Sequence, residues 1–344
     1  MQNYALQCIL KSLGHTPYTF DLGLFTWKDW IIFNLKSCVK KLIGRRAYYI
    51  ASPKSYHNSE MPLRRFVDTH ISLIAPRTRR PSASAIHKYG LECIIVGSDQ
   101  VWRPKYNINI ADMYLSFATL QDIKRVAYAA SFGTDVWEYR SKDCGRCRRY
   151  AQKFDAISVR EDSAISLCKT HLGVDASLVL DPTLLLSSDD YSKLITHQTN
   201  DKKPYLFAYL LDISNDKIEY VQRVANILGI EPRIVEADND ITEDDSIEKW
   251  LSNIRNARYV ITDSFHGCAF SIIFNREFIT FGNKARGNSR IYSLLKQLNL
   301  ENRIVQDNLW QADIHNIEIE WQLVNSTLEH LKDVSINFLR TNIK

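Results

Sequence analysis

The hydrophobic pattern begins in a helical period. Apolar residues recur at helical spacing from Tyr4 to Leu13, and Gly14 is well suited to end that helix. Residues 18–22 are then typical of a strand. Because an α/β chain usually starts with a strand rather than a helix, we expect a first strand and its loop to be missing from this sequence.

Further along, compact apolar runs alternate with segments of helical spacing. Small, polar or charged residues follow each run directly. This alternation predicts a parallel sheet, and ligands bind at the carboxyl edge of such open sheets. The expected strands are 92–96, 125–130, 156–159 and 178–180, and a helix is expected to open at 160–163.

The same alternation restarts after a polar stretch at residues 187–203. Its second round again pairs buried-looking strands with amphipathic helices. The expected strands are 205–211, 233–235, 259–262 and 278–281, and the expected helices are 217–228, 246–256, 268–274, 291–298 and 319–339.

Two rounds of strand–helix alternation predict an α/β protein with two Rossmann-like domains that face a cleft. We place a hinge near residues 182–203. The predicted domains are 1–185 and 186–325, followed by a C-terminal helix at 326–344.

Two segments of the first half depart from this rhythm. Residues 27–46 mix large apolar side chains with lysine and arginine. Such a segment is either a helix lying on an anionic membrane surface or a long amphipathic helix that covers a core, and the second pattern is the commoner one. Residues 52–80 are polar and basic, and we expect a mobile loop with a short helix there.

Composition narrows the possible functions only slightly. The formal net charge of +5 over 344 residues does not indicate a nucleic-acid partner. No apolar run reaches the roughly 18 residues of a membrane span, and we expect no signal peptide. Seven scattered cysteines indicate reduced thiols and a cytoplasmic location.

The sharpest local motif is 263–267 (DSFHG), which runs from a predicted strand into a helix. The start of a helix offers free backbone N–H groups and positive potential, where phosphate binds readily. His266 could also deliver a proton there; alternatively, it only caps the helix. Arg160 follows another strand and suits a phosphate or carboxylate, unless it only pairs with a neighbouring acid.

Two further segments carry candidate binding residues. The basic loop 282–290 contains Lys284 and Arg290, which would grip an anion or remain solvated. The segment 97–102 (GSDQVW) offers a carboxylate, an amide and an indole, which suit a sugar, with Asp99 as a base. Alternatively, Asp99 caps a helix and Trp102 lies in the core. A weaker candidate of the same kind is 131–133 (SFG).

Other familiar chemistry is not indicated. Cys144 and Cys147 have metal-site spacing, but a zinc site needs about four ligands and no second pair follows. The chain has neither a GxGxxG nor a Walker A sequence. We therefore expect neither a metal nor a redox cofactor.

Taken in order, these motifs resemble the polysaccharide pyruvyl transferase family. A segment at 64–68 is also similar to one in that family, and the resemblance spans about residues 3–303. The motifs are 96–102 (VGSDQVW), 129–133 (AASFG), 158–161 (SVRE), 179–183 (VLDPT) and 262–267 (TDSFHG).

The resemblance implies a GT-B-like architecture, with phosphoenolpyruvate as the donor and a hexose of a lipid-linked bacterial polysaccharide repeat unit as the acceptor. The first domain would be the acceptor side and the second the donor side. The resemblance also implies that His266 and Arg160 handle the phosphate and carboxylate of the donor, with a basic residue of 284–290 assisting. Combined with the residue patterns, the expected catalytic residues are His266, Arg160 and Asp99, the expected donor-binding residues are Arg160, Ser264, His266, Gly267, Lys284 and Arg290, and the expected acceptor-binding residues are Gly97, Ser98, Asp99, Gln100, Trp102, Ser131 and Phe132.

The expected reaction forms a pyruvate ketal and releases phosphate, with phosphoenolpyruvate as co-substrate and no other cofactor. The expected location is the cytoplasm, with peripheral contact to the inner membrane surface through residues 27–46. A nucleotide-sugar glycosyltransferase of the same architecture is the alternative, for which Glu236 or Asp238 would bind the ribose.

Overall fold

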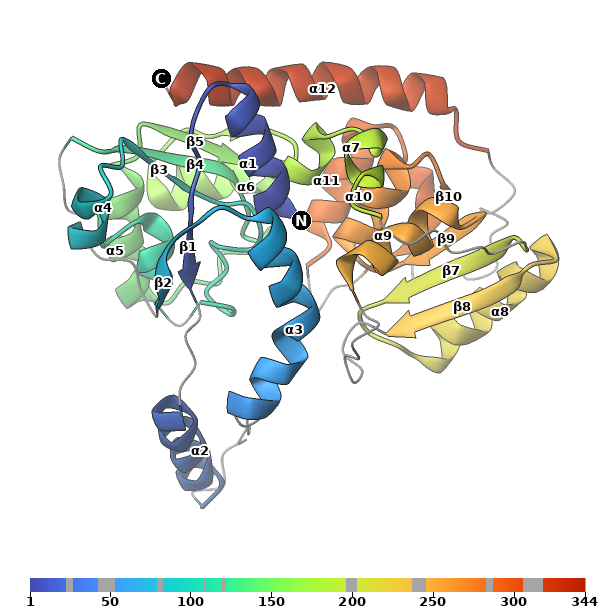
Figure 1. Cartoon of the computed structure of the whole chain (residues 1–344), viewed down its shortest axis with the longest axis horizontal. Coiled ribbons are helices and arrows are strands. Elements are labelled where there is room, and N and C mark those ends of the chain that lie inside the picture. The colour runs from blue at the N-terminus through green and yellow to red at the C-terminus, as the bar shows by residue number, and fades with distance from the viewer. Residues whose placement is uncertain are drawn as a thin grey trace.

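The chain folds into two parallel sheets with helices packed around them, and a further pair of parallel strands (Figure 1). This is the α/β, Rossmann-like arrangement that the sequence predicts. The computed structural model describes residues 1–22, 27–42, 53–78, 83–107, 109–118, 122–195, 203–236, 246–282, 287–305 and 318–343.

The first sheet has the strand order β3-β4-β5-β6, all parallel. Its central strand is rich in alanine, and residues 126–130 are fully buried because helices cover both faces. The carboxyl ends of these strands lead into Gly97, Ser131, Arg160 and Asp181. The strands are β3 (Cys93–Val96), β4 (Lys124–Ala130), β5 (Ala156–Val159) and β6 (Ser177–Leu178).

Short helices surround this sheet. One of the turns, η3, begins with Pro182 and is capped by Asp181, whose side chain accepts a hydrogen bond from the backbone N–H of Thr183. The helical segments are α1 (Gln2–Ser12), α4 (Ala83–Lys88), η1 (Ile110–Tyr114), α5 (Ser141–Ala151), α6 (Asp162–Leu167), η2 (Cys168–Leu172), η3 (Pro182–Leu185) and α7 (Ser188–Ser192).

The described part of the polar segment at 52–80, residues 53–78, is a long helix followed by a strand, so the prediction of a mobile loop with a short helix was wrong there. It forms α3 (Pro53–His70) and β2 (Leu73–Thr78), and β2 pairs in parallel with β1 (Thr19–Leu22). Phe66 anchors α3, since it is almost fully buried and its ring packs against Tyr4. A few buried apolar positions in a basic segment were enough to fix a helix that the overall polarity concealed.

Between β1 and α3 lies α2 (Trp27–Leu42), the amphipathic helix predicted from 27–46; residues 43–46 lie outside the described part of the chain. It lies away from both sheets (Figure 1). Of the helices that the structure describes, none combines the length and the apolar character needed to cross a membrane.

The second sheet has the strand order β11-β10-β9-β7-β8. The chain moves from β7 to β8 on one side and then returns to place β9 on the other side of β7. The carboxyl ends of β7 and β9 therefore flank a topological switch point, where open α/β sheets bind ligands. The strands are β7 (Tyr205–Leu210), β8 (Glu231–Glu236), β9 (Tyr259–Thr262), β10 (Glu277–Phe281) and β11 (Ile304–Val305).

Serine caps fix where helices of this half begin. The Ser264 hydroxyl accepts from the backbone N–H of Gly267, so α10 starts three residues earlier than predicted and includes His266 in its first turn. The helices are α8 (Asn215–Leu228), α9 (Ile247–Asn256), α10 (Phe265–Ile273), α11 (Ser289–Gln297) and the short turn η4 (Glu301–Arg303).

The last helix, α12 (Trp321–Asn342), returns over the first half of the chain (Figure 1). Near its start, the Trp321 indole donates to Glu277, which is the first residue of β10 in the second sheet. Near its end, the Ser335 hydroxyl accepts from the backbone N–H of Leu180 at 2.9 Å, and Phe338 packs on Tyr128. The helix thus ties both sheets together; the domain boundaries at 185 and 325 stay predictions.

Candidate functional site

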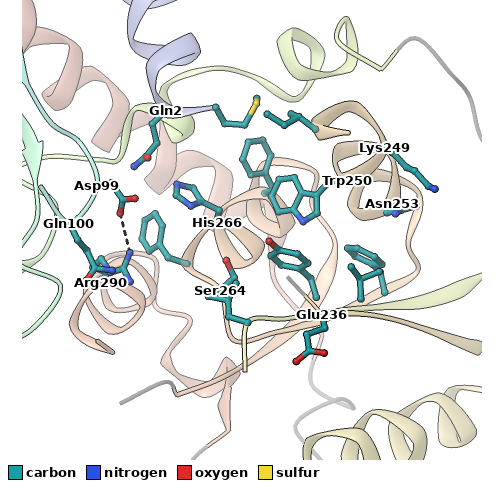
Figure 2. A pocket seen from close by; sticks show the side chains of 18 of the residues that line it. Gln2, Asp99, Gln100, Glu236, Lys249, Trp250, Asn253, Ser264, His266 and Arg290 are labelled. Atoms are coloured by element: carbon teal, nitrogen blue, oxygen red, sulfur yellow. Dashed lines mark hydrogen bonds and ion pairs between the residues drawn. The ribbon is translucent and has the colours of Figure 1, made fainter. Parts of the chain in front are cut away.

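A cavity of about 1040 Å³ lies between the carboxyl edges of the two sheets (Figure 2). One end is charged, and the other is largely aromatic and aliphatic. The loop after β3 and the start of α1 line one side, and the second sheet with α9, α10 and α11 lines the other. Its lining includes Gln2, Asp99, Gln100, Tyr106, Tyr209, Glu236, Lys249, Trp250, Asn253, Ser264, Phe265, His266 and Arg290.

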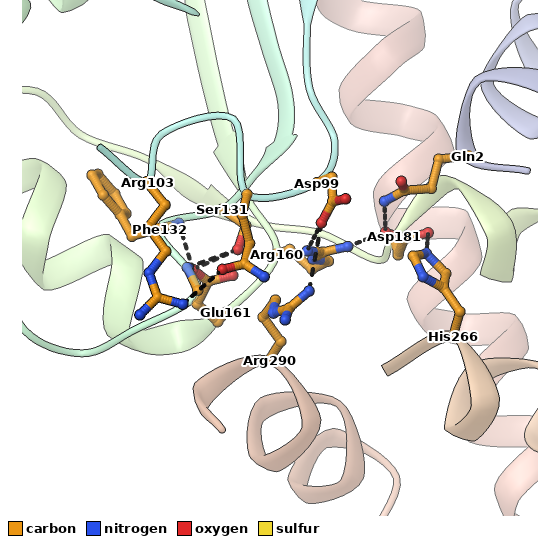
Figure 3. Close-up of polar contacts among 12 residues, drawn as sticks. Gln2, Asp99, Arg103, Ser131, Phe132, Arg160, Glu161, Asp181, His266 and Arg290 are labelled. Atoms are coloured by element: carbon orange, nitrogen blue, oxygen red, sulfur yellow. Dashed lines mark hydrogen bonds and ion pairs between the residues drawn. The ribbon is translucent and has the colours of Figure 1, made fainter. Parts of the chain in front are cut away.

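The charged end is organised around a buried ion pair. Arg160, at the end of β5, donates from Nη1 to Asp181 Oδ2 at 2.6 Å (Figure 3). Asp181 is held from three sides, since it also accepts from the Thr183 hydroxyl at 2.7 Å and from the Gln2 amide at 2.7 Å. Burial would raise the pKa of Asp181, but Arg160 and His266 outweigh it and lower that pKa.

Asp99 is the second carboxylate at Arg160, and it is held much more loosely. It accepts from Arg160 Nη2 at 3.2 Å and from Arg290 Nη1 at 3.5 Å. Its side chain is 58% exposed, whereas that of Asp181 is fully buried. The cleft walls would raise the pKa of Asp99, but Arg160, His266 and Arg290 outweigh them and lower it to about 2. Asp99 is therefore an exchangeable partner of the two arginines.

Both arginines lie over one aromatic ring. The guanidinium carbon of Arg160 is 4.5 Å from the Phe265 ring centroid, and that of Arg290 is 5.9 Å away. Burial and the neighbouring charge of Arg160 lower the pKa of Arg290 to about 10, so it stays charged at neutral pH. Arg160, which is almost fully buried, and Arg290, which lines the cavity, thus meet at its charged end from different halves of the chain.

His266 completes the charged end. Its Nε2 lies 4.0 Å from Asp181 Oδ1 and makes no hydrogen bond within the described residues. Burial lowers the pKa of His266 to about 4, against the opposing effects of Asp181 and Asp99, so the imidazole is neutral at pH 7 while the cavity is empty. The structure thus brings His266 and Arg160 to the same carboxylate, as predicted from their positions at two sheet edges.

Three other residues, Ser264, Gly267 and Lys284, were also predicted to bind the donor. Ser264 lines the cavity and caps α10. Gly267 is buried under it, and a Cβ there would come within 2.3 Å of the Thr262 hydroxyl, so its role is close packing of α10 on β9. Lys284 lies outside the residues that the structure describes.

Among the predicted acceptor residues, Asp99 and Gln100 line the cavity and Gly97 does not. Gly97 has a φ of +140°, and a Cβ there would come within 1.9 Å of the Tyr128 carbonyl oxygen. Only glycine therefore lets the loop after β3 lie this close to β4. Ser98 is buried beside it.

Trp102, Ser131 and Phe132 are buried, which corrects their assignment to the acceptor. Trp102 stacks on Tyr114 and donates from its indole to the Met113 carbonyl, so the core alternative holds. The Ser131 hydroxyl donates to Glu161 Oε1, and the Phe132 backbone N–H donates to the same oxygen. These residues therefore support the loop after β4 from inside the core.

The sequence analysis gave no role to two buried acids, Glu161 and Asp181, or to two aromatic residues of the cavity, Tyr209 and Trp250. Glu161 holds the loop after β4, and burial raises its pKa. Asp181 follows a strand, so the edge rule that selected Arg160 could have selected it too. Tyr209 and Trp250 carry no such signal, because they meet at the cavity only once α9 packs beside β7.

Comparison with known proteins identifies a family for this chain. The family model for polysaccharide pyruvyl transferase matches residues 1–285, which is most of the chain and includes every motif above. A comparison with curated proteins gave no match. The chain therefore belongs to the polysaccharide pyruvyl transferase family, and its family indicates a transferase.

Proposed function

We propose that the protein transfers pyruvate from phosphoenolpyruvate to a hexose of a bacterial capsular or exopolysaccharide repeat unit, forming a ketal. One observation carries this proposal: Arg160 and Arg290 converge on the loosely held Asp99 at a cavity end that also holds His266. Two cations with an exchangeable partner suit a small ligand with several negative charges.

The lengths of the ion pairs indicate how such a ligand enters. The 2.6 Å pair of Arg160 with Asp181 is fully buried and persists, because breaking it would leave an unpaired buried charge. The contacts of Asp99 at 3.2 and 3.5 Å are weaker and partly exposed. The carboxylate or phosphate of phosphoenolpyruvate would therefore displace Asp99 and leave the Asp181 pair intact.

The same exchange prepares the acid–base groups. Removal of Asp99 from its arginines would raise its low pKa and make it a better base for a sugar hydroxyl. A phosphate beside His266 would raise the pKa of the imidazole from about 4, so that it could bind phosphate as a donor or act as an acid. Neither group is well matched to its role before the donor binds.

In the proposed reaction, the C3 methylene of phosphoenolpyruvate takes up a proton and C2 becomes electrophilic. The oxygen of one sugar hydroxyl bonds to C2, and the C2–O bond to phosphate breaks. A second hydroxyl of the same sugar closes the ketal. One of the two hydroxyl protons balances the proton gained at C3, and the other leaves with phosphate. Arg160 and Arg290 would stabilise the charge on the departing phosphate.

The test is incubation of the protein with phosphoenolpyruvate and a panel of lipid-linked galactosides. The expected product is heavier than the acceptor by one pyruvate less one water, with an equal amount of phosphate released. His266→Ala should lower turnover on the order of a hundredfold. Turnover close to wild type in that variant would remove His266 from the site.

A nucleotide-sugar glycosyltransferase is the second candidate, because Glu236 lies at the end of β8 and lines the cavity. Asp238, the other possible ribose ligand, lies outside the described residues. Thermal stabilisation by phosphoenolpyruvate and not by UDP or GDP would support pyruvyl transfer, and the reverse result would support glycosyl transfer.

A further inference from the structure

We infer that the acceptor sugar binds against an aromatic wall of the cavity, which is formed by Tyr209 of β7 and Trp250 of α9. Figure 2 shows Trp250 in the cavity lining. This inference rests on the proposed function and moves the acceptor away from the segment at 97–132. The reason for the change is burial: the indole and phenyl groups offered by Trp102 and Phe132 are inside the core.

The aromatic wall is a fixed surface. Tyr209 is at the end of β7, and its ring meets that of Trp250 edge to face at 5.5 Å. Phe270 lies on the other side of Trp250, at 5.1 Å, and is fully buried. Tyr209 and Trp250 themselves are only half-buried and line the cavity. Two supported but accessible rings suit the apolar face of a hexose.

Polar groups surround this wall. Glu236 is the last residue of β8, and Lys249 and Asn253 lie on α9 (Figure 2). A carboxylate, an ammonium group and an amide can bind the hydroxyls that ring a sugar. From the opposite side, Tyr106 of the first half is 49% exposed and also lines the cavity.

The wall also lies on the path to the charged end. Ser264, Phe265 and His266 line the same cavity as Trp250, and all three follow β9 at the switch point of the sheet. A sugar on the wall would thus direct its hydroxyls toward a donor bound at Arg160. Arg160 from the first half, with Arg290 and His266 from the second, would then bind the donor, and Tyr209 and Trp250 would supply the sugar surface.

The experiment distinguishes an effect on acceptor binding from an effect on donor binding. Trp250→Ala should raise the KM for a lipid-linked galactoside about tenfold or more, which corresponds to ~1.4 kcal/mol. The thermal shift caused by phosphoenolpyruvate should remain as in the wild type. The matched control is Trp137→Ala, because Trp137 is half-buried and packs on Tyr139 away from the cavity lining; its KM should not change.

An unchanged acceptor KM in Trp250→Ala would overturn the inference, and so would an equal loss of phosphoenolpyruvate binding. The proposed function fails differently: the wild type would then form no ketal with any acceptor. In that case, direct calorimetric titration with the galactoside still tests the wall. If the galactoside binds the wild type but not Trp250→Ala, the inference is supported. If it binds the wild type and Trp250→Ala equally well, the inference is refuted.

A second inference rests on α2 alone: we propose that this helix docks the protein on an anionic lipid surface. Trp27, Ile31, Leu35 and Val39 recur at every fourth position, so they form one stripe. These four and Ile32 are between 43% and 60% exposed, and α2 lies away from both sheets (Figure 1). A stripe of this size is costly to leave in water.

The charge of α2 indicates that its partner is an anionic lipid surface. Residues 27–42 contain four lysines and one acidic residue, and Lys28 is exposed beside the stripe. Apolar residues with tryptophan on one face and lysine next to them are the pattern of helices that lie in the interface of anionic membranes. Such docking would hold the cavity near a lipid-linked acceptor, at the cytoplasmic face of the membrane.

Sedimentation with vesicles tests this proposal. The protein should pellet with vesicles of phosphatidylglycerol and phosphatidylcholine, and much less with phosphatidylcholine alone or in high salt. Ile31→Asp/Leu35→Asp should reduce binding on the order of tenfold or more. The control Ile227→Asp changes an equally exposed residue of α8 and should bind normally. Equal pelleting of both variants would refute the proposal, as would a concentration-dependent dimer that only the α2 variant abolishes.

Discussion

Two aspartates at the sheet edges each hold a cation at 2.6 Å, yet only one pair belongs to the candidate site. Asp181 holds Arg160 in the first half, and Asp263 holds Lys217 in the second. Both carboxylates are fully buried. Distance and burial therefore do not separate a functional pair from a structural one.

The difference lies in what else the cation and the carboxylate contact. Asp263 accepts from the backbone N–H groups of Leu211 and Asp212, and Lys217 also donates to the Asp212 carbonyl, so the pair clamps the turn after β7. Arg160 instead has a second carboxylate partner, Asp99, which faces the cavity, and its Nε has no hydrogen-bond partner in the described part of the chain. A buried ion pair with an exchangeable partner is suited to a ligand.

The sharpest way to test this comparison is to exchange the two cations. Arg160→Lys keeps the charge beside Asp181 but loses the fork that reaches Asp99 and the donor. Transfer should fall on the order of 10²- to 10³-fold, or about 3–4 kcal/mol, in steady-state kinetics. Lys217→Arg should keep near-normal turnover. Equal losses in both variants would show that the pairs do not differ in function.

A fall in pH should destabilise the region of the Arg160–Asp181 pair more than that of the Lys217–Asp263 pair, because His266 lies beside Asp181. The pKa of His266 is lowered from 6.5 to about 4, so the unfolded chain binds an extra proton between these values. Stability of the empty protein should therefore fall as the pH falls from about 6.5 to 4, by at most about 3 kcal/mol from this group. Urea unfolding should show a smaller loss for His266→Gln; the same slope in both proteins would contradict the shift.

Removing the carboxylate of Asp263 should lower the stability of the fold and leave turnover unchanged. Asp263→Asn leaves Lys217 without its counter-charge and weakens the clamp on Leu211 and Asp212. Unfolding free energy should drop by about 2 kcal/mol, with turnover per folded molecule unchanged. A specific loss of turnover at full stability would instead assign this pair to the reaction.

The smallest effect is expected from removal of the Thr183 hydroxyl, which donates a hydrogen bond to Asp181. Thr183→Val removes the hydroxyl that donates to Asp181 at 2.7 Å, while the backbone N–H of residue 183 still donates to it. The loss of stability should be about 1 kcal/mol, with a severalfold lower affinity for phosphoenolpyruvate in a thermal-shift titration. Unchanged affinity would mean that the backbone alone fixes this carboxylate.

Local patterns were sufficient for most of the fold. Strand runs that end in polar residues predicted the sheet edges, and the same rule selected Arg160 and His266, which lie beside the same carboxylate, Asp181. The pattern failed at 53–78, where a basic surface hides the few apolar contacts, such as that of Phe66 with Tyr4, that order α3. It also assigned Trp102 to a ligand, because an indole near a strand end looks the same whether the chain buries it or exposes it.

By itself, the sequence determined the order of strands and helices, the positions of chemical groups at strand ends, and the family, because these depend on local periodicity and ordered motifs. Only the tertiary structure decided which groups meet. The partners of Arg160 come from 61 residues before it and 21 after it, and the wall of Tyr209 and Trp250 exists only once α9 packs beside β7. Contacts between distant segments depend on how whole elements pack, and periodicity along the chain carries no record of that packing.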